Sequence, residues 1–403
     1  MTCGREAIAS QRDSAVKKPR FDRSAWGSLN RPRFWIAGAT GLLVLGAFFV
    51  FFWNDGRPYE PPKNSFDGSS EALEQTLVVP TLDTPIPENK SAIWCSSFQF
   101  AWNHLKTDVT KGEIQLKNAE AVAARLNQAE QSENDLDASD FYAMAGRVRD
   151  GIVQKIQTEM EHKFPDVPAP QLAAPADGVV AYGYMRARLK FSTPFFENDE
   201  KLAFIDSTGT EIGVKSFGIR KRDDYAYKQL REQVKVLYAS EDLLERGEGG
   251  EFIIDPCKYS HPYQIVLARI NRKPTLAEAI ADAHKKVTEY SRKGWPIDLR
   301  ARDTLLIPGM HWRISHHFKE LEGTDKQFQN PTLRGLYLDT ALQTIEFRLD
   351  RSGAELASES KVFVKPAATY FDFNRSFLII LKKRDAEHPI FVMWVDNSEL
   401  LDK

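Results

Sequence analysis

The stretch TIEFRLDRSGAELASES, Thr344 to Ser360, decides the fold together with FDFNRSFLIILKKRDAEHPIFVMWVDN, Phe371 to Asn397. In the first stretch, apolar and polar side chains alternate until Gly353, which is typical of a strand that ends in a turn or loop. Small residues mixed with charges follow. The second stretch contains two apolar runs separated by a polar segment, which predicts a pair of strands. The C-terminal part of the chain therefore predicts a strand, a loop and a strand pair.

This order resembles the reactive-loop region of the serpins, where a strand leads into a hinge, an exposed loop, the motif Phe-x-x-x-Pro-Phe and the closing strands. Gly353 and Glu355 match the hinge. The number of residues from Gly353 to Phe377 is close to the length of the reactive loop in the family. The closing strands are matched by Phe373, Phe377, Pro389, Phe391, Val395 and Asn397.

Three upstream segments resemble serpin elements in the same order. Val179 to Phe196 resembles the central strand of the large sheet and an aromatic turn, with Phe191 where the family usually has Trp and Gly183 where it usually has Asn. Leu202 to Ile219 resembles the next hairpin, and Asp303 to Gly323 a strand followed by a helix. Together with the C-terminal match, these segments cover about half of the chain. The resemblance implies an α+β fold with mixed β-sheets, surrounding helices and an exposed C-terminal reactive-type loop.

Helical periodicity adds further elements. FQFAWNHLKTDV resembles the first serpin helix, because Phe98, Trp102 and Leu105 lie at helical spacing. A second helix is predicted from Lys117 to Glu130. A longer one is predicted after Asp137, from an apolar stripe at Phe141, Met144, Val148, Ile152, Ile156 and Met160. Fewer residues separate these helices than in the family, which implies a trimmed core with a narrower main sheet.

The later part of the folded region reads as strands and one helix. Short strands are predicted at Val234 to Ala239, Glu251 to Ile254 and Gln264 to Ile270. Thr275 and Glu278 predict a capping box at the start of the helix TLAEAIADAHKKVTEY. Strands and helices without a βαβ repeat indicate α+β.

An apolar segment near the N-terminus predicts one transmembrane helix. Phe34 to Trp53 is twenty residues long and has no charge, so a helix at about 1.5 Å per residue crosses the hydrocarbon core. Eight Lys and Arg residues precede it against three acidic residues, which places the N-terminus in the cytoplasm and the remainder outside. A cleaved signal peptide is the alternative, but the segment is long and no small-x-small cleavage site follows closely, which favours an uncleaved signal anchor.

The predicted organisation has four parts. Residues 1–33 form a cytoplasmic basic tail, 34–53 a single-pass transmembrane helix, 54–90 a linker with six prolines, and 91–403 the serpin-like domain, which is extracytoplasmic. Within the linker, LVVP from Leu77 to Pro80 is open to a second interpretation as an edge strand.

Composition excludes several classes of function. The net charge is −2 with mixed signs, which does not indicate nucleic-acid binding. Cys3, Cys95 and Cys257 match no metal cluster, and unpaired thiols are favoured over a Cys95–Cys257 bridge. No cofactor or catalytic motif is found, so we expect no enzyme. We also expect no metal site, since the histidine cluster matches no standard zinc signature; its residues are His311, His316, His317 and Glu320, of which His316 and Glu320 could share a helix face.

The resemblance assigns a role to the loop. In an inhibitory serpin the hinge inserts into the large sheet after a serine protease has attacked the loop, and small hinge residues ease this insertion. The hinge here is Gly353, Ala354, Glu355, Leu356, Ala357 and Ser358. Counting along the loop places the scissile bond between Ala367 and Ala368, which suits an elastase-like protease. Gly183 and Phe191 fall in the region where the sheet opens.

Two features of the hinge distinguish this chain from the family. Leu356 and Glu359 are larger than the usual Ala. Arg351 replaces the usual acidic residue before the hinge, and Gly309 the Lys that often pairs with it. Two functions therefore remain open, namely a membrane-anchored serine-protease inhibitor and a non-inhibitory serpin-fold binding or structural module of the cell envelope. The sequence indicates neither the target protease nor the oligomeric state.

Overall fold

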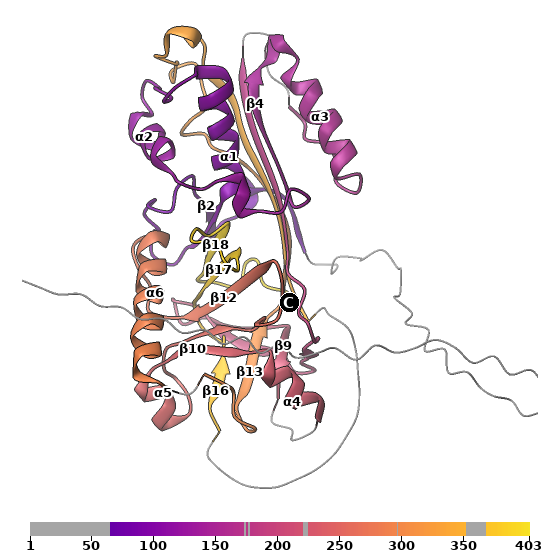
Figure 1. Cartoon of the computed structure of the whole chain (residues 1–403), viewed down its shortest axis with the longest axis vertical. Coiled ribbons are helices and arrows are strands. Elements are labelled where there is room, and N and C mark those ends of the chain that lie inside the picture. The colour runs from indigo at the N-terminus through magenta and orange to yellow at the C-terminus, as the bar shows by residue number, and fades with distance from the viewer. Residues whose placement is uncertain (1–64, 173–174, 176–177, 221–224, 296, 352–367) are drawn as a thin grey trace, which may run out of the picture. The chain divides into compact units, whose positions relative to one another are not determined.

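The computed structural model describes residues 65–403 except 173–174, 176–177, 221–224, 296 and 352–367. The described residues belong to one compact unit, Tyr59–Lys403. Their strands form four sheets with helices packed around them (Figure 1).

The largest strands form a five-stranded mixed sheet. Its order is β1 (Phe66–Ser69), β14 (Met310–His317), β15 (Leu338–Leu349), β5 (Val179–Arg188) and β4 (Phe141–Arg147). β15 runs parallel to β5 and antiparallel to β14. β1 is parallel to β14, and β4 is antiparallel to β5.

Both faces of this sheet are covered. Apolar residues of α1 (Ser96–His104) pack against one face together with Ile345 and Phe347 of β15. α3 (Ile152–Lys163) packs against the other face over Tyr182 and Tyr184 of β5. Figure 1 shows these two helices on opposite sides of the long strands. Burial on both faces explains why β5 is apolar or aromatic at nearly every position up to Met185.

A seven-stranded sheet supplies the second layer of the core. Its order is β10 (Lys235–Ala239), β11 (Phe252–Asp255), β12 (Tyr263–Arg269), β17 (Phe377–Lys383), β18 (Phe391–Val395), β3 (Ser91–Cys95) and β2 (Thr76–Val78). α6 (Leu276–Lys293) packs Leu276, Ala279 and Ala283 against one face of this sheet.

The remaining elements are shorter. A four-stranded sheet has the order β16 (Tyr370–Asp372), β13 (Thr304–Pro308), β9 (Ser216–Ile219) and β6 (Phe196–Glu197), and β7 (Leu202–Ile205) pairs with β8 (Glu211–Val214). Shorter helices are α2 (Glu120–Gln128), α4 (Tyr225–Glu232) and α5 (Glu241–Arg246). A π-helical turn at Leu105–Thr110 extends α1, and 3-10 turns lie at Ser70–Ala72, Glu133–Asp135, Val148–Asp150 and Pro331–Leu333.

Several predictions made from the resemblance are confirmed. β5 is an interior strand of the five-stranded mixed sheet. β7, β8 and β9 follow it in the chain, as predicted for Leu202 to Ile219. The strand before the hinge is β15, and the closing strands β17 and β18 are antiparallel neighbours. The helix at Thr275 is present, and the Thr275 hydroxyl accepts a hydrogen bond of 3.1 Å from the Glu278 amide.

The prediction of one long helix after Asp137 is wrong. Phe141–Arg147 is strand β4, and only Ile152–Lys163 is helical. Gly151 separates the two with φ of 81°, a left-handed backbone that interrupts a helix. Alternate residues of β4 face different layers, with Phe141 in the main core and Tyr142 under α3.

Two further predictions need correction. The helix predicted before Gly323 is absent among the described residues, since β14 continues to His317 and turns follow. The linker prediction is wrong at Phe66–Ser69, where β1 pairs with β14. For Leu77 to Pro80 the second interpretation, an edge strand, is confirmed by β2 (Thr76–Val78), which pairs with β3 at the edge of the seven-stranded sheet. The five strands of the described main sheet include β1 at one edge.

The described residues include no helix that is long and apolar enough to cross a membrane. The predicted segment, Phe34 to Trp53, lies outside them.

Replacing Thr275 by Ala should lower the free energy of unfolding by about 1 kcal/mol, because the N-terminal amides of α6 lose an acceptor. Urea denaturation of the full chain in detergent measures this change. Thr288→Ala is the matched control, since Thr288 lies inside the same helix and donates to the His284 carbonyl. A change of about 0.5 kcal/mol or less is expected for the control. Equal losses in the two variants would contradict the capping role.

Candidate functional site

The predicted hinge and one predicted scissile residue lie outside the described residues. These are Gly353, Ala354, Glu355, Leu356, Ala357, Ser358 and Ala367. The chain on both sides of this segment is described. Leu349 ends β15, Asp350 and Arg351 follow it, and Ala368 leads into β16. The candidate site therefore consists of these two attachment points and the strands between which the hinge is predicted to insert.

The start of the segment is held by ionic groups. The Asp350 carboxylate binds His311 Nε2 at 3.0 Å and also contacts Arg348. His311 Nδ1 lies 2.7 Å from the carboxylate of Asp402 near the C-terminus. Burial disfavours the charged imidazole, but the hydrogen bonds to Asp350 and Asp402 outweigh it, so the pKa of His311 lies above its ordinary value.

Arg351 and Gly309, which differ from the residues usual in the family, do not form a pair with each other in this structure but lie beside Glu197 and Asp402. The Arg351 guanidinium lies 3.8 Å from the Glu197 carboxylate on the four-stranded sheet. A Cβ at Gly309 would lie 3.0 Å from Asp402 Oδ2. Gly309 thus leaves room for the carboxylate that binds His311, and a side chain there would displace it.

The end of the segment is held by a second polar group. The Thr369 amide donates to Asp303 Oδ1 at 2.9 Å, and Arg300 contacts both Asp303 and the Thr369 hydroxyl. The Ala368 carbonyl packs against Gly247, where a Cβ would lie 2.7 Å away. Gly247 has φ of 83°, so a larger residue would meet both backbone strain and a clash. Ala368 is thus fixed beside the start of β16.

The strand order defines where a returning segment can pair. A chain that reverses after β15 runs antiparallel to it, and both edges of β15 are occupied, by β14 and by β5. Since β5 is parallel to β15, a reversed strand placed between them is antiparallel to both neighbours. Such insertion requires separation of the ladder that joins Leu338–Arg348 to Val179–Arg188.

Side chains on the α3-side face of the sheet hold this ladder together. The Glu346 carboxylate on β15 accepts from the Tyr184 hydroxyl at 3.1 Å and lies 3.3 Å from Arg186 Nε. Arg186 also donates to Asp166 at 2.9 Å. Burial disfavours ionised Tyr184, and the neighbouring Glu346 adds to the effect, so the pKa of this tyrosine lies well above its ordinary value and its hydroxyl stays a donor.

On the opposite face, Gly183 and Gln343 are register partners. The Gln343 amide donates to the Cys95 carbonyl at 3.0 Å and to the Ser97 hydroxyl at 2.9 Å. A Cβ at Gly183 would lie 2.5 Å from the Ser97 carbonyl oxygen. The structure therefore places Gly183 on the boundary between β5 and β15, where the start of α1 lies directly against the sheet. The sequence indicated Gly183 but neither Gln343 nor Ser97.

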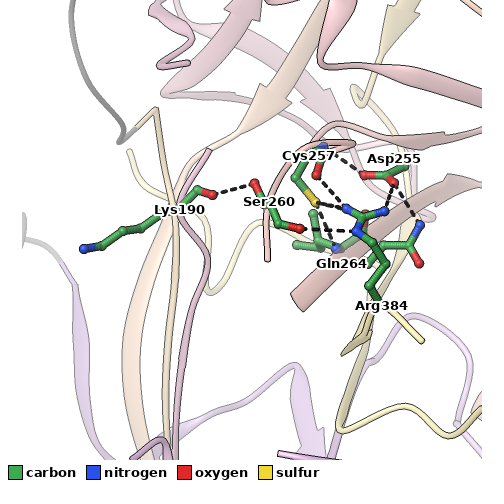
Figure 2. A network of polar contacts seen from close by, with 7 residues as sticks. Lys190, Asp255, Cys257, Ser260, Gln264 and Arg384 are labelled. Carbon is green, nitrogen blue, oxygen red and sulfur yellow. Dashed lines mark hydrogen bonds and ion pairs between the residues drawn. The ribbon is translucent and has the colours of Figure 1, made fainter. Parts of the chain in front are cut away.

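Phe191 lies in a different environment from Gly183. Its ring contacts Phe195 and Phe217, with ring centroids 4.8 and 5.9 Å apart. The preceding Lys190 carbonyl accepts from the Ser260 hydroxyl at 2.7 Å (Figure 2). Phe191 therefore fixes the chain just beyond β5 to the four-stranded sheet and does not contact Gly183.

The polar network in Figure 2 fixes this end of β5 to the seven-stranded sheet. Arg384 donates to the Asp255 carboxylate at 3.0 Å, to the Cys257 carbonyl at 2.6 Å and to the Ser260 carbonyl at 3.2 Å. The Asp255 side chain is only 1% exposed, so its charge depends on Arg384 for compensation. The network is a structural tie between Lys190 and β12.

The two described cysteines are free thiols. Cys95 contacts Ser97 and Met185, whereas the Cys257 sulfur accepts from the Ile265 amide at 3.2 Å. Burial raises the pKa of Cys95 to about 11 and that of Cys257 well above its ordinary value. Both thiols are therefore protonated and weakly reactive at neutral pH.

The histidine cluster does not form a helix face. His311, His316 and His317 all lie on β14, and Glu320 lies in the turn beyond it. His316 Nδ1 is 2.6 Å from the Ser70 hydroxyl, whereas His317 Nδ1 is 2.7 Å from Glu322 on the other face. The described residues contain no group of three His, Cys, Asp or Glu side chains that could hold a metal ion.

Comparison with known proteins gives structural similarity at low identity. No family model and no curated protein matches the sequence. The chain is similar to mouse protein-Z dependent protease inhibitor, with 12% identity, a TM-score of 0.49 and coverage of 76% of this chain and 91% of that one. It is also similar to thyroxine-binding globulin in complex with thyroxine, with 13% identity, a TM-score of 0.46 and coverage of 76% and 93%.

A third similar structure, native protease nexin-1 with heparin, has 12% identity and a TM-score of 0.39, with coverage of 61% of this chain and 65%, less than two thirds, of that one. Sequence identities and TM-scores as low as these do not indicate the activity of this protein. The fold is a serpin-like mixed α+β fold with several mixed sheets, in which β15 lies beside parallel β5 and β17 pairs with β18.

Gly183→Ala should lower the free energy of unfolding by about 1–3 kcal/mol, because the added methyl group meets the Ser97 carbonyl and must move either β5 or α1. Urea denaturation of the full chain measures the change. Gly112→Ala is the control, since nothing lies within 4 Å of its Cβ position. An unaffected Gly183 variant would show that the contact between sheet and helix is loose.

Arg384→Ala should lower the free energy of unfolding by about 3–5 kcal/mol, because it leaves the buried Asp255 charge unpaired. Adding Asp255→Asn to this variant should restore part of the loss. Arg246→Ala, which breaks an exposed pair with Asp242, should change the free energy by about 1 kcal/mol or less. The absence of recovery in the double variant would rule out the charge argument.

Proposed function

We propose that this protein is a serpin-type inhibitor of a serine protease. The observation that carries the proposal is the position of residues 352–367 in the strand order. The segment follows β15, which is an interior strand with parallel β5 as its neighbour. A strand formed by the start of this segment would be antiparallel to both. The site thus has the topology that insertion after cleavage requires.

The hinge sequence supports insertion as a two-faced strand. Ala354, Leu356 and Ser358 alternate with a second set of positions, namely Glu355, Ala357 and Glu359. The sheet into which they would insert has one face on the core and one on the α3 side. The face shared by Glu346, Arg348 and Arg186 already carries charges, so glutamates of an inserted strand would meet polar neighbours there.

The proposed target is an elastase-like serine protease. With Ala368 fixed beside β16 and Ala367 before it, the predicted scissile bond would present small side chains to the protease. Small residues suit a shallow specificity pocket. The bond lies close to the attachment held by Thr369 and Asp303, so the attacked bond would be near the fixed end of the segment and the hinge near the other end.

The β5–β15 ladder favours a second function. In it the protein is a non-inhibitory serpin-fold module that binds a partner or supports the cell envelope. Ten residues of β15 have register partners on β5, and Glu346 adds a side-chain hydrogen bond to Tyr184 across the ladder. On the opposite face, Gln343 binds β15 to the Cys95 carbonyl. Leu356 and Glu359 are also larger than typical hinge residues. In this function the ladder stays closed and the segment serves as a surface loop.

In either function, we propose that residues 34–53 anchor the chain in a membrane and that the domain lies outside the cytoplasm. The uncharged segment and the basic residues before it support this placement. Twelve residues, 54–65, lie between Trp53 and the start of β1 at Phe66. The connection to β1 is therefore short, which would keep the domain close to the membrane.

Incubation of the full chain in detergent with an elastase-type serine protease tests inhibition. An inhibitor should give a covalent complex that resists denaturation and runs on a gel at the summed mass of the two proteins. Ala367→Arg should transfer this complex to a trypsin-type protease, because a basic residue would then precede the attacked bond. Cleavage within residues 352–367 that leaves the protease fully active would favour the non-inhibitory module.

Ala357→Pro is the control for insertion. Proline removes a backbone donor that an inserted central strand needs, so this variant should be cleaved without forming the complex. Cleavage at the same bond with the complex still formed would mean that trapping does not depend on insertion of the hinge.

A further inference from the structure

The attachment at the start of the segment contains a histidine between two carboxylates. We call His311, Asp350 and Asp402 the His311 clamp. The side chain of His311 is 8% exposed, and those of Asp402 and Asp350 are 9% and 18% exposed. Three chain regions meet there, since His311 lies on β14, Asp350 follows β15 and Asp402 is the penultimate residue.

The geometry requires a charged imidazole. The two ring nitrogens lie 2.7 and 3.0 Å from carboxylate oxygens, and carboxylates only accept hydrogen bonds. A neutral imidazole has one N–H group and can satisfy one of the two acceptors, whereas imidazolium donates to both. The charges agree with this reading: protonated His311 and Arg348 balance Asp350 and Asp402, and loss of the proton leaves one negative charge in excess.

The other charged groups around the clamp are already paired. A hollow of about 200 Å³ lies beside His311, and its further charged lining residues are Asp67, Asp166, Arg186, Arg313, Glu346 and Arg348. Arg313 binds Asp67 at 2.6 Å, and Arg186 binds both Asp166 and Glu346. From the β8–β9 connection, Lys215 contributes its backbone amide to the Asp402 carbonyl. His311 is the histidine among these groups, and a histidine changes its charge near neutral pH.

The two carboxylates are not held equally. The backbone of Asp402 is fixed on both sides, since its amide donates to the Gly309 carbonyl at 2.9 Å and its carbonyl accepts from Lys215 at 2.8 Å. Its carboxylate is also the closer partner of His311. Asp350 has Arg348 as an alternative partner two residues away. A neutral His311 therefore keeps Asp402 and loses Asp350.

We propose that the His311 clamp is a proton-dependent attachment that holds Asp350, just after β15, to Asp402 and releases Asp350 when His311 loses its proton. The direction follows from the raised pKa of His311 in the folded protein. The stabilisation is fully present below the ordinary histidine pKa, and it is lost as the pH rises through the folded value. This inference does not depend on protease inhibition.

Two measurements on the full chain in detergent test the proposal. Carbon-13 NMR of ring-labelled histidine, with His311→Gln to assign the signal, gives the midpoint of His311 between about pH 5 and pH 9. Hydrogen exchange, corrected for the intrinsic pH dependence, gives the protection of residues 348–351. We expect His311 to titrate above its ordinary value and the protection to fall at the same midpoint.

Matched variants separate this effect from a general one. His311→Gln should lose the pH-dependent step in protection. His104→Gln is the control, because His104 also lies between two carboxylates, Asp108 at 2.9 Å and Glu133 at 2.8 Å, but on the surface. It should leave the step unchanged. Should His311→Gln fail to fold, Asp350→Asn provides the test, since it should lower the midpoint of His311 and remove the step.

Either of two results would overturn the proposal. One is a His311 midpoint at or below that of an ordinary histidine. The other is a raised midpoint with protection of residues 348–351 that does not follow it. Because no protease is used, these results are independent of whether the chain forms a complex with one.

Discussion

The pairing of β5 with β15 is the constraint on which the rest of the structure depends. The two strands are parallel, so they cannot be joined by a tight turn, and about 150 residues lie between Arg188 and Leu338. Those residues build β6 to β14 and α4 to α6, that is, much of the other sheets and the helix that covers the seven-stranded one. The ladder also sets the position of α1, because Gly183 and Gln343 meet the backbone at Cys95 and Ser97.

The same ladder is both the obstacle to insertion and the reason that insertion could be favourable. Opening it exposes backbone donors and acceptors in the middle of a sheet covered on both faces, and such groups are costly to leave unpaired. A strand inserted between β5 and β15 would satisfy both exposed edges, so one ladder would be exchanged for two. The contacts that do not return are those between side chains across the ladder, chiefly Glu346 with Tyr184 and Arg186. Inhibition therefore requires that the free energy gained from one additional ladder exceeds the free energy lost with these side-chain contacts. A permanently closed sheet corresponds to the opposite balance.

The sequence was informative where periodicity and burial agree. Strands β5, β15, β17 and β18 are long apolar or alternating runs, and each was predicted. It failed at β1, since four residues at a sheet edge carry no period that distinguishes them from a linker. At β2 it left both interpretations open, because Leu77 to Pro80 fits a linker as well as an edge strand. It also failed at Phe141–Arg147, because apolar residues there fit helical spacing as well as a strand buried on both faces.

The contacts at the candidate site could not be predicted from the sequence. The resemblance indicated Gly183, the hinge and the scissile bond, whose roles stay predictions, whereas Gln343 and the role of His311 were not indicated. Their partners are distant in sequence: Gln343 binds Cys95, 248 residues away, and His311 binds Asp402, 91 residues away. A polar residue in a strand predicts an exposed face unless its partner is known, so no local pattern identifies such a contact.

The two attachments of the chain that flank residues 352–367 differ in the chemical groups that form them. The end is held by the Asp303 carboxylate, the Arg300 guanidinium and a backbone ladder from β13 to β16. The start is held by a histidine, whose charge does change. If the proposed release occurs, it begins at Asp350, just after β15, while Thr369 stays bound to Asp303. An insertion mechanism needs mobility at that first end, and a simple surface loop has no such requirement.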